Sequence, residues 1–321
     1  MPVMNRMAAI DVGSNGIRLV IADVSKKFKA NLDSHISEFP FTIVHAQRAA
    51  VRLGADAFHL GYLTDATVDM VTEVLQSFRD KMDGLKVSHY RAVATSAVRE
   101  SSNGQAFAKT IRKRTGINLE IIGGLEEAQL MFHAISVSYP LHDESVILID
   151  MGGGSVELTV AHEGRALGAE TLPLGPVRLL AQLDSQGIPE KQIASLVTSH
   201  AHGVRTFVNT ELTHRENSLV SYAAGGNIEA IGKLRIPILG KTKSYKIKLN
   251  DLQTITPVLL GMSVEERISE FNLRPDRADV IAVAAVVLQM IMHEAGLKRI
   301  LIPGLGIKDG ILLQLKINSF S

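Results

Sequence analysis

The chain has 321 residues, of which 46% are hydrophobic and 21% are charged, and it contains no cysteine. This composition is typical of a folded globular protein long enough for two domains, and it excludes disulfides, thiolate metal sites and a cysteine nucleophile. The formal net charge of +1 gives no support for direct nucleic-acid binding, so any attraction for phosphate has to be local.

Two segments of the sequence argue against a membrane role. The N-terminal residues reach Asp11 before an apolar signal region can form, which argues against a secretory signal. The longest uncharged stretch, residues 280–292, is too short to cross a bilayer and predicts a buried helix. The sequence therefore predicts a cytoplasmic protein.

The first part of the chain alternates strands with helices, which predicts an α/β protein. One expected helix begins at Thr64 and Asp65, which are possible N-terminal caps. Another ends in a basic turn before Gly116, a pattern more typical of a solvated helix end than of an anion site. The expected elements are a strand, glycine turn and strand over 8–24, a helix over 64–82, a strand leading into a loop over 89–100, a helix over 103–116, a strand over 118–123 and a helix over 125–139.

The segment "VILIDMGGGSVELTV" then begins a new set of strands, with Asp150 and Glu157 on either side of three glycines. A glycine run lets backbone N–H groups crowd around a phosphate, although a hairpin turn with a bulge explains this stretch equally well. A third glycine turn, Gly225 and Gly226, ends a strand of small residues, and a helix is expected to begin near Asn227. That helix start favours an anion, or simply an Asn cap.

An internal repeat connects the first two turns. A shift of the chain by 139 positions aligns an Asp, a turn glycine and a second strand in both halves. The aligned pairs are Ile10 with Ile149, Asp11 with Asp150, Gly13 with Gly152, Leu19 with Leu158 and Ala22 with Ala161. We therefore expect a duplicated domain, in which each half begins with a β-hairpin and a tight polar turn. Two such turns facing one another could hold a phosphate chain, with carboxylates left for a metal ion and water.

Six blocks in this order, "AIDVGSNGIRLVIADV", "ATSAVRES", "GGLEEAQL", "LIDMGGGSVEL", "LPLGPVRL" and "AAGGNIEAI", resemble the exopolyphosphatase and guanosine pentaphosphate (pppGpp) phosphohydrolase family. The resemblance runs from about Ala8 to the C-terminus and is closest to the short, two-domain form. It implies a duplicated actin-like, ribonuclease-H-like α/β fold with an interdomain cleft. It further implies Mg²⁺-dependent hydrolysis of terminal phosphate from polyphosphate or pppGpp, and a homodimer.

The resemblance also implies roles for particular residues. Glu127 corresponds to the catalytic carboxylate, although alone it would pass for an ordinary acidic residue of a first helical turn. Asp150 and Glu157 would act in catalysis and, with Asp11, hold Mg²⁺ or the attacking water. Arg99 would donate to a phosphate further along, or be a surface arginine, and Arg178 has no definite role. The remaining phosphate-binding residues implied are Asp11, Gly13, Ser14, Asn15, Gly152, Gly153, Gly154, Ser155, Gly225, Gly226 and Asn227.

The chain departs from the family pattern at three places. Gly16 stands where a small hydroxyl residue is usual, Asn227 replaces a Thr or Ser, and Lys308 with Asp309 replaces an Arg-Glu pair. The expected domains are residues 1–126, with the segment 305–321 packing back on them, and residues 127–304. Turns near Gly13, Gly152 and Gly225 are expected to line the cleft.

The leading hypothesis is an exopolyphosphatase, and three alternatives remain. The same site could hydrolyse pppGpp. An ATP-binding phosphotransferase of the sugar-kinase type would use the same hairpins, and the altered turns would also suit a polyphosphate or nucleotide sensor without turnover.

Overall fold

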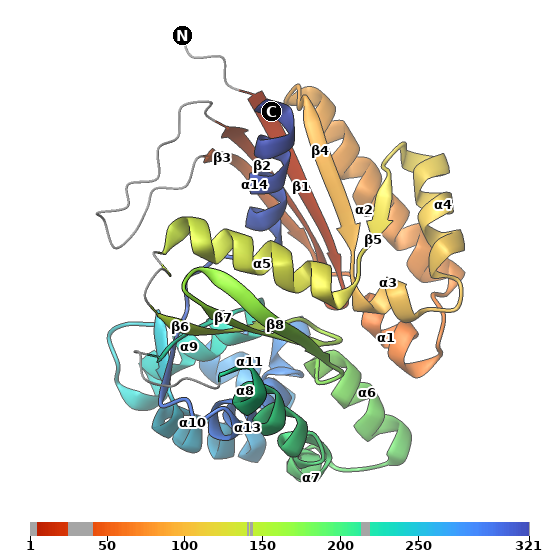
Figure 1. Cartoon of the computed structure of the whole chain (residues 1–321). Helices are drawn as coiled ribbons and strands as arrows, with labels where there is room; N and C mark the ends of the chain where they lie inside the picture. Colours follow the sequence, from red (N-terminus) through yellow and green to blue (C-terminus); the bar gives the residue numbers. More distant parts are fainter. Residues whose placement is uncertain (1–4, 25–40, 140, 142–143, 213–218, 321) are drawn as a thin grey trace. The chain divides into compact units, whose positions relative to one another are not determined.

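The computed structural model describes residues 5–24, 41–139, 141, 144–212 and 219–320, which form two compact units (Figure 1). The first unit comprises Met1–Pro140 and Leu305–Ser321, and the second comprises Leu141–Gly304. Within the described part of the chain, no helix is both long and apolar enough to cross a membrane.

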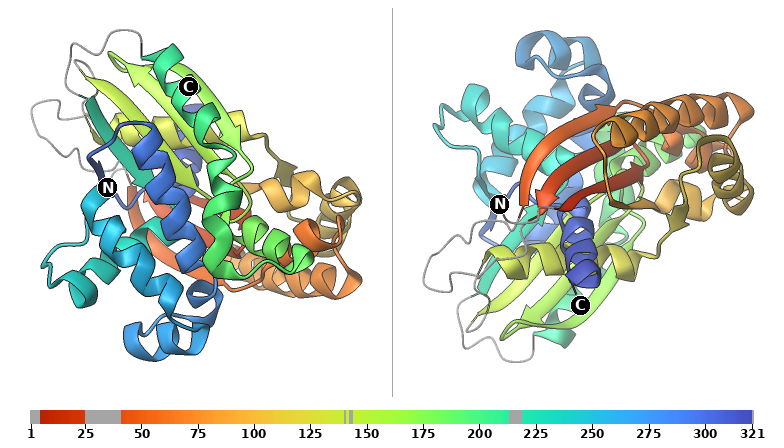
Figure 2. Two further views of the ribbon diagram at one scale, coloured as in Figure 1. Left: turned by 90° about the horizontal axis from the view of Figure 1, so that it is seen from below. Right: turned by 90° about the horizontal axis from the view of Figure 1, so that it is seen from above.

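The first unit is built on a five-stranded sheet in the order β3-β2-β1-β4-β5, whose twist is visible from above in Figure 2. Strand β2 pairs antiparallel with both β1 and β3, and β4 and β5 continue the sheet parallel to β1. The strands are β1 (Asn5–Gly13), β2 (Gly16–Val24), β3 (Phe41–Ala49), β4 (His89–Ala94) and β5 (Leu119–Ile121).

Helices cover both faces of this sheet, because successive side chains of β1 point to opposite faces and are apolar on both. Ala8 and Ile10 belong to one core, together with apolar residues of α1, α2, α3 and α4. Met7 and Ala9 belong to a second core with residues of α5 and α14. The helices are α1 (Leu53–His59), α2 (Asp65–Gly84), α3 (Ser96–Glu100), α4 (Gly104–Thr115), α5 (Gly124–Ser138) and α14 (Ile307–Phe320).

The second unit contains a six-stranded sheet in the order β10-β11-β9-β6-β7-β8. Its strands are β6 (Ser145–Met151), β7 (Val156–His162), β8 (Arg165–Leu172), β9 (Leu219–Ala224), β10 (Lys246–Lys248) and β11 (Arg299–Leu301). The helical elements are α6 (Pro176–Gln186), the short 3₁₀ helix η1 (Glu190–Gln192), α7 (Ile193–Thr198), α8 (Ala201–Glu211), α9 (Gly226–Leu239), α10 (Leu249–Gly261), α11 (Val264–Phe271), α12 (Pro275–Ala278) and α13 (Ile281–Glu294). The buried helix expected over residues 280–292 is confirmed, since the side chains of α13 lie almost entirely inside the core.

The two sheets share one topology, which confirms the duplication inferred from the repeat. In each, a hairpin (β1–β2 or β6–β7) has an antiparallel third strand on one side, β3 or β8. On the other side lie parallel strands, β4 and β5 or β9 and β11. The register agrees as well, because Asp11 pairs with Arg18 in the first hairpin and Asp150 with Glu157 in the second.

Several helix ends follow the expected local chemistry. The Thr64 side chain accepts a hydrogen bond from the Thr67 N–H and begins α2, and α4 ends at Gly116 in the left-handed conformation. One segment differs from the expectation. Residues 96–100 form the short helix α3 and not a loop, because the N–H groups of Val98 and Arg99 donate to the Thr95 carbonyl.

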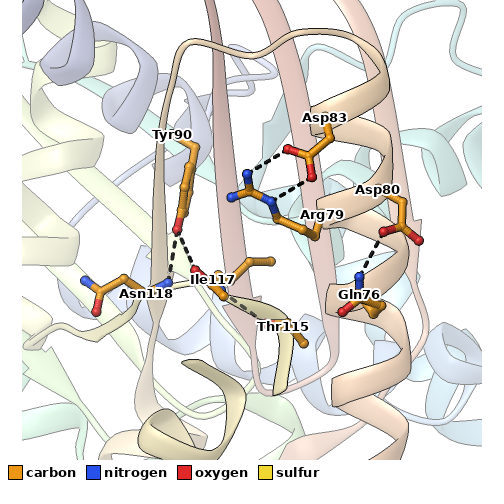
Figure 3. A network of polar contacts seen from close by, with 9 residues as sticks. Gln76, Arg79, Asp80, Asp83, Tyr90, Thr115, Ile117 and Asn118 are labelled. Atoms are coloured by element: carbon orange, nitrogen blue, oxygen red, sulfur yellow. Dashed lines mark hydrogen bonds and ion pairs between the residues drawn. The ribbon is translucent and has the colours of Figure 1, made fainter. Parts of the chain in front are cut away.

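A polar network joins the end of α4 to β4 in the first unit (Figure 3). The Tyr90 hydroxyl donates to the Gly116 carbonyl at 3.3 Å and accepts from the Asn118 N–H at 3.1 Å. The Arg79 guanidinium lies 5.9 Å from the centroid of the Tyr90 ring and forms two hydrogen bonds with Asp83, at 2.7 and 3.0 Å. This network therefore holds α2 and the α4–β5 connection against the sheet.

The C-terminal helix fixes the position of α5. A Cβ atom at Gly310 of α14 would lie 2.2 Å from the Leu130 carbonyl oxygen of α5, so the two helices touch through their backbones. The units divide between residues 140 and 141, whereas the sequence placed the boundary after residue 126. Because α5 packs on α14 and the first sheet, Glu127 belongs to the first unit together with segment 305–321.

Candidate functional site

The first glycine turn closes the β1–β2 hairpin, with Gly13 paired to Gly16 and Ser14 and Asn15 at the tip. Ser14 is buried, and its hydroxyl lies 3.0 Å from the Ser96 hydroxyl. Its carbonyl accepts a hydrogen bond from the Gly54 N–H of α1 at 2.9 Å. The turn is thus held in place by the beginning of two helices, α1 and α3.

Two arginines that the sequence did not indicate bind Asn15. Arg48 Nη2 donates to the Asn15 carbonyl at 2.6 Å, and Arg52 Nε donates to Asn15 Oδ1 at 2.8 Å. Arg48 lies near the end of β3 and Arg52 directly before α1. Both contacts span more than thirty residues, so no local spacing in the sequence could have shown them.

The second glycine turn closes the β6–β7 hairpin over residues 152–155. Asp150 and Glu157 pair directly across the two strands, so their side chains project from the same face of the sheet. Both are buried, with relative exposures of 7% and 2%. The Ser155 hydroxyl donates to Glu157 Oε1 at 2.7 Å. The structure thus brings together three of the residues predicted from the sequence.

The same row of side chains has a different charge in each half. In the first sheet, Asp11 pairs with Arg18 and Arg18 with Arg48, giving one carboxylate and two guanidiniums, and Arg18 Nη1 contacts Asp11 Oδ2 at 3.0 Å. In the second sheet, the row consists of Asp150, Glu157 and Thr171. The first row therefore favours an anion and the second a cation.

The beginning of α6 lies directly against the second turn. The Gly153 carbonyl accepts hydrogen bonds from the N–H groups of Val177 and Arg178, at 2.8 and 3.3 Å. The Arg178 side chain donates from Nε to the Gly154 carbonyl at 2.6 Å. Arg178, which had no definite role in the sequence, thus fixes the second glycine turn.

The third glycine turn lies beside the second, because β9 runs parallel to β6 with Ala224 paired to Asp150. A Cβ atom at Gly225 would lie 2.3 Å from the Met151 carbonyl oxygen, so a larger residue could not approach β6 as closely. Helix α9 begins at Gly226, and the buried Asn227 accepts a hydrogen bond from Arg277 Nη1 through Oδ1. The expectation that the Gly13 turn faces these two turns across a cleft stays a prediction.

Glu127 lies in the first turn of α5 and is 4% exposed. Arg99 Nη1 contacts Glu127 Oε1 at 2.6 Å and also donates to the Ile122 carbonyl at 2.7 Å. The role of Arg99 as a phosphate donor stays a prediction; the contact that the structure shows is to the predicted catalytic carboxylate.

The neighbouring Glu126 is more exposed than Glu127 and contacts a different arginine. It is about 40% exposed and contacts Arg91 Nη2 at 2.5 Å. Partial burial lowers the pKa of Arg91, but hydrogen bonds to Glu126 and Glu120 together raise that pKa above its usual value. Glu126 therefore serves an ion pair on the surface of the first unit.

The carboxylates of the second turn fit a magnesium ion. Among the residues that the structure describes, no three His, Asp or Glu side chains are grouped so as to hold a metal ion. Mg²⁺, however, usually takes only one or two protein carboxylates and completes its shell with water and substrate phosphates. Two buried carboxylates directly opposite one another repel each other, and a divalent cation would relieve that repulsion. Asp11 is less suited, because it contacts Arg18.

Comparisons with known proteins agree on one family. The family model described as the Ppx/GppA phosphatase family matches residues 31–318. Exopolyphosphatase 2 of Mycobacterium tuberculosis is 27% identical over 339 residues, covering 97% of this chain and 99% of that protein. Exopolyphosphatase 1 of Mycobacterium leprae is 22% identical over 312 residues, covering 96% and 89%.

Solved structures show the same fold. An exopolyphosphatase from Cytophaga hutchinsonii superposes with a TM-score of 0.82 at 22% identity, covering 98% of both chains. The Aquifex aeolicus member of the Ppx/GppA family gives a TM-score of 0.73 at 20% identity, covering 99% of both. The duplicated α/β fold and the family resemblance expected from the sequence are therefore confirmed, and the chain belongs to the Ppx/GppA phosphatase family.

Proposed function

We propose that this chain is an exopolyphosphatase, which releases the terminal phosphate of linear inorganic polyphosphate by in-line attack of water. The observation that carries the proposal is the burial of all three carboxylates implied by the family pattern, Glu127, Asp150 and Glu157. Acidic side chains are rarely buried unless they are paired or serve chemistry, and two of these face each other across a hairpin.

The chemistry requires an oriented water, donors around the transferred phosphoryl group and compensation of its charge. Glu127 would orient or deprotonate the water, and its contact with Arg99 would hold the carboxylate in place. Asp150 and Glu157 would hold Mg²⁺, which would offset the charge on the phosphate oxygens when bound. The glycine turns would supply backbone N–H donors, and Arg48 and Arg52 place positive charge at the first turn.

The second candidate substrate is pppGpp, which ends in the same kind of phosphoanhydride. The buried pair of Asn227 and Arg277 beside the third turn supports pppGpp as a candidate substrate. Amide and guanidinium groups can hydrogen-bond a sugar or a base, which polyphosphate lacks. We also propose a homodimer, because two-fold homodimers are by far the commonest of the soluble oligomers; light scattering of the purified chain measures its mass.

The test compares phosphate release from long-chain polyphosphate, pppGpp and ATP, each with and without Mg²⁺. We expect the highest kcat/KM on polyphosphate, and no turnover of any substrate without Mg²⁺. A higher kcat/KM on pppGpp would make the second candidate the function. Transfer of phosphate from ATP to an acceptor would point to a phosphotransferase, and tight binding without release would indicate a sensor.

A further inference from the structure

An arginine binds the same backbone atom in both glycine turns. The shift of 139 positions that aligns the two hairpins places Asn15 on Gly154. Arg48 Nη2 donates to the Asn15 carbonyl at 2.6 Å, and Arg178 Nε donates to the Gly154 carbonyl at 2.6 Å. The equivalent tip residues of the two turns, Asn15 and Gly154, therefore each present a carbonyl oxygen to a guanidinium.

The two arginines are not themselves aligned by the repeat. The shift that places Asn15 on Gly154 would place Arg48 on Gly187, which ends α6. Arg48 comes from a strand, β3, whereas Arg178 comes from the first turn of a helix, α6. The same contact is thus made from two different elements, so it is not simply inherited from the duplicated hairpin.

A glycine makes room for each of these contacts, Gly16 in the first turn and Gly175 directly before α6. A Cβ atom at Gly16 would lie 2.8 Å from Arg48 Nη2 and 3.0 Å from Arg48 Cζ. A Cβ atom at Gly175 would lie 2.2 Å from the Gly154 carbonyl carbon and would push the start of α6, with Arg178, away from the turn. The absence of the usual hydroxyl residue at position 16 therefore has a physical reason, since a side chain there would displace the Arg48 guanidinium.

A turn that receives phosphate has to hide its carbonyl oxygens, because they carry partial negative charge and repel an anion. A guanidinium is suited to this task, since it binds the oxygen through a planar donor group and stays charged at every physiological pH. The peptide group is planar, so fixing the carbonyl also fixes the plane of the following N–H. Each arginine thus sets both the shape and the charge of its turn.

We propose that Arg48 and Arg178 are positioning residues, one for each glycine turn, each of which holds the carbonyl oxygen of its own turn away from a bound phosphate. This inference rests on the proposed function, in which the glycine turns supply N–H donors to the phosphates of the substrate. It gives Arg178 a role, and it implies that the position of the Arg48 guanidinium depends on a glycine at position 16.

The experiment measures kcat, KM and the melting temperature of Arg48→Gln and Arg178→Gln on linear polyphosphate, together with direct binding of polyphosphate to each protein. Each variant is expected to raise KM by on the order of 10- to 100-fold, the usual loss for a charged hydrogen bond. The melting temperature should fall by only a few degrees, because each lost hydrogen bond also contributes modestly to folding. The matched control is Arg112→Gln, which removes an exposed charge from α4 and should leave KM unchanged.

Two further variants separate positioning from charge alone. Arg178→Lys keeps the positive charge that Arg178→Gln removes, but it lacks the Nε donor. Polyphosphate binding by Arg178→Lys should therefore depend on salt as in the wild type, while its KM stays raised. Gly16→Ser should raise KM as Arg48→Gln does, and the double variant should be no worse than either single one, because both act through one guanidinium.

Wild-type KM in both glutamine variants, or full recovery in Arg178→Lys, would overturn the inference. So would a lowered melting temperature with unchanged KM, which would indicate a purely structural contact. If the wild-type protein neither binds nor hydrolyses polyphosphate, the proposed function fails first, before any variant is compared, and the inference fails with it.

Discussion

At the scale of single residues, the partner of one aspartate distinguishes the two halves of the molecule. Asp11 and Asp150 occupy the same place in their hairpins, but Arg18 lies opposite the first and Glu157 opposite the second. Like charges directly opposite one another in a sheet destabilise it, and burial makes this repulsion stronger. The second hairpin thus gives up stability for a site that suits a cation.

We predict that Asp150→Asn abolishes Mg²⁺-dependent turnover without unfolding the protein. In metal-free buffer, the free energy of unfolding should stay the same or rise by up to about 1 kcal/mol, because one of two repelling charges is removed. Mg²⁺ should raise the melting temperature of the wild type but not that of the variant.

Asp251→Asn is the matched control for Asp150→Asn, because Asp251 is also buried but contacts Arg235 at 2.7 Å. Its loss leaves a buried arginine without its carboxylate, which should cost about 3–5 kcal/mol and leave the effect of Mg²⁺ intact. If Mg²⁺ stabilises Asp150→Asn as much as the wild type, the metal site has been assigned to the wrong residues.

A second prediction at the scale of residues distinguishes two roles for Arg99, positioning Glu127 or binding phosphate. Its contact with Glu127 Oε1 indicates that it positions the carboxylate, so Arg99→Gln should lower kcat by about 10- to 100-fold and change KM little. Arg91→Gln, which removes the partner of Glu126, is the control and should keep most of the activity. A large rise of KM with unchanged kcat would instead support the phosphate-binding role expected from the sequence.

At the scale of elements, α5 is positioned by a backbone contact with α14. The close approach at Gly310 of α14 is to Leu130 of α5, which lies three residues after Glu127. The position of Glu127, the predicted catalytic carboxylate, therefore depends on residues at the far end of the chain.

Gly310→Ala should consequently lower both stability and activity. The added methyl group would meet the Leu130 carbonyl oxygen, and overpacking of this kind typically costs about 1–3 kcal/mol. We expect a lower melting temperature and a lower kcat on polyphosphate. Gly84→Ala at the end of α2 is the control, because a Cβ atom there meets nothing within 4 Å. Equal effects of the two substitutions would show that the α5–α14 contact does not matter.

At the scale of the whole molecule, the duplication was predictable because it leaves a local pattern. Strand, aspartate, turn glycine and strand recur at a fixed shift, and alternating apolar residues define the two hairpins. The helix limits at Thr64 and Gly116 were predictable for the same reason, since capping depends on neighbouring residues.

The contacts of the site were not predictable in this way. Arg48 and Arg52 reach Asn15 from the third strand and the segment after it, so their role depends on strand order and not on spacing. The pairing of Arg99 with Glu127 likewise joins α3 to α5. The sequence suggested which residues are functional, but only the fold shows which of them bind one another.

The central claim is that Glu127 drives hydrolysis at the end of a polyphosphate chain, and one measurement tests it most directly. Orthophosphate release from linear polyphosphate is followed with Mg²⁺ for the wild type, Glu127→Gln and Glu126→Gln. Loss of a carboxylate that acts on the attacking water should lower kcat by on the order of 10²- to 10⁴-fold in Glu127→Gln, with KM almost unchanged. Glu126→Gln should keep most of the activity, because its carboxylate is exposed and contacts Arg91. Equal losses in the two variants, or a greater loss in Glu126→Gln, would contradict the claim.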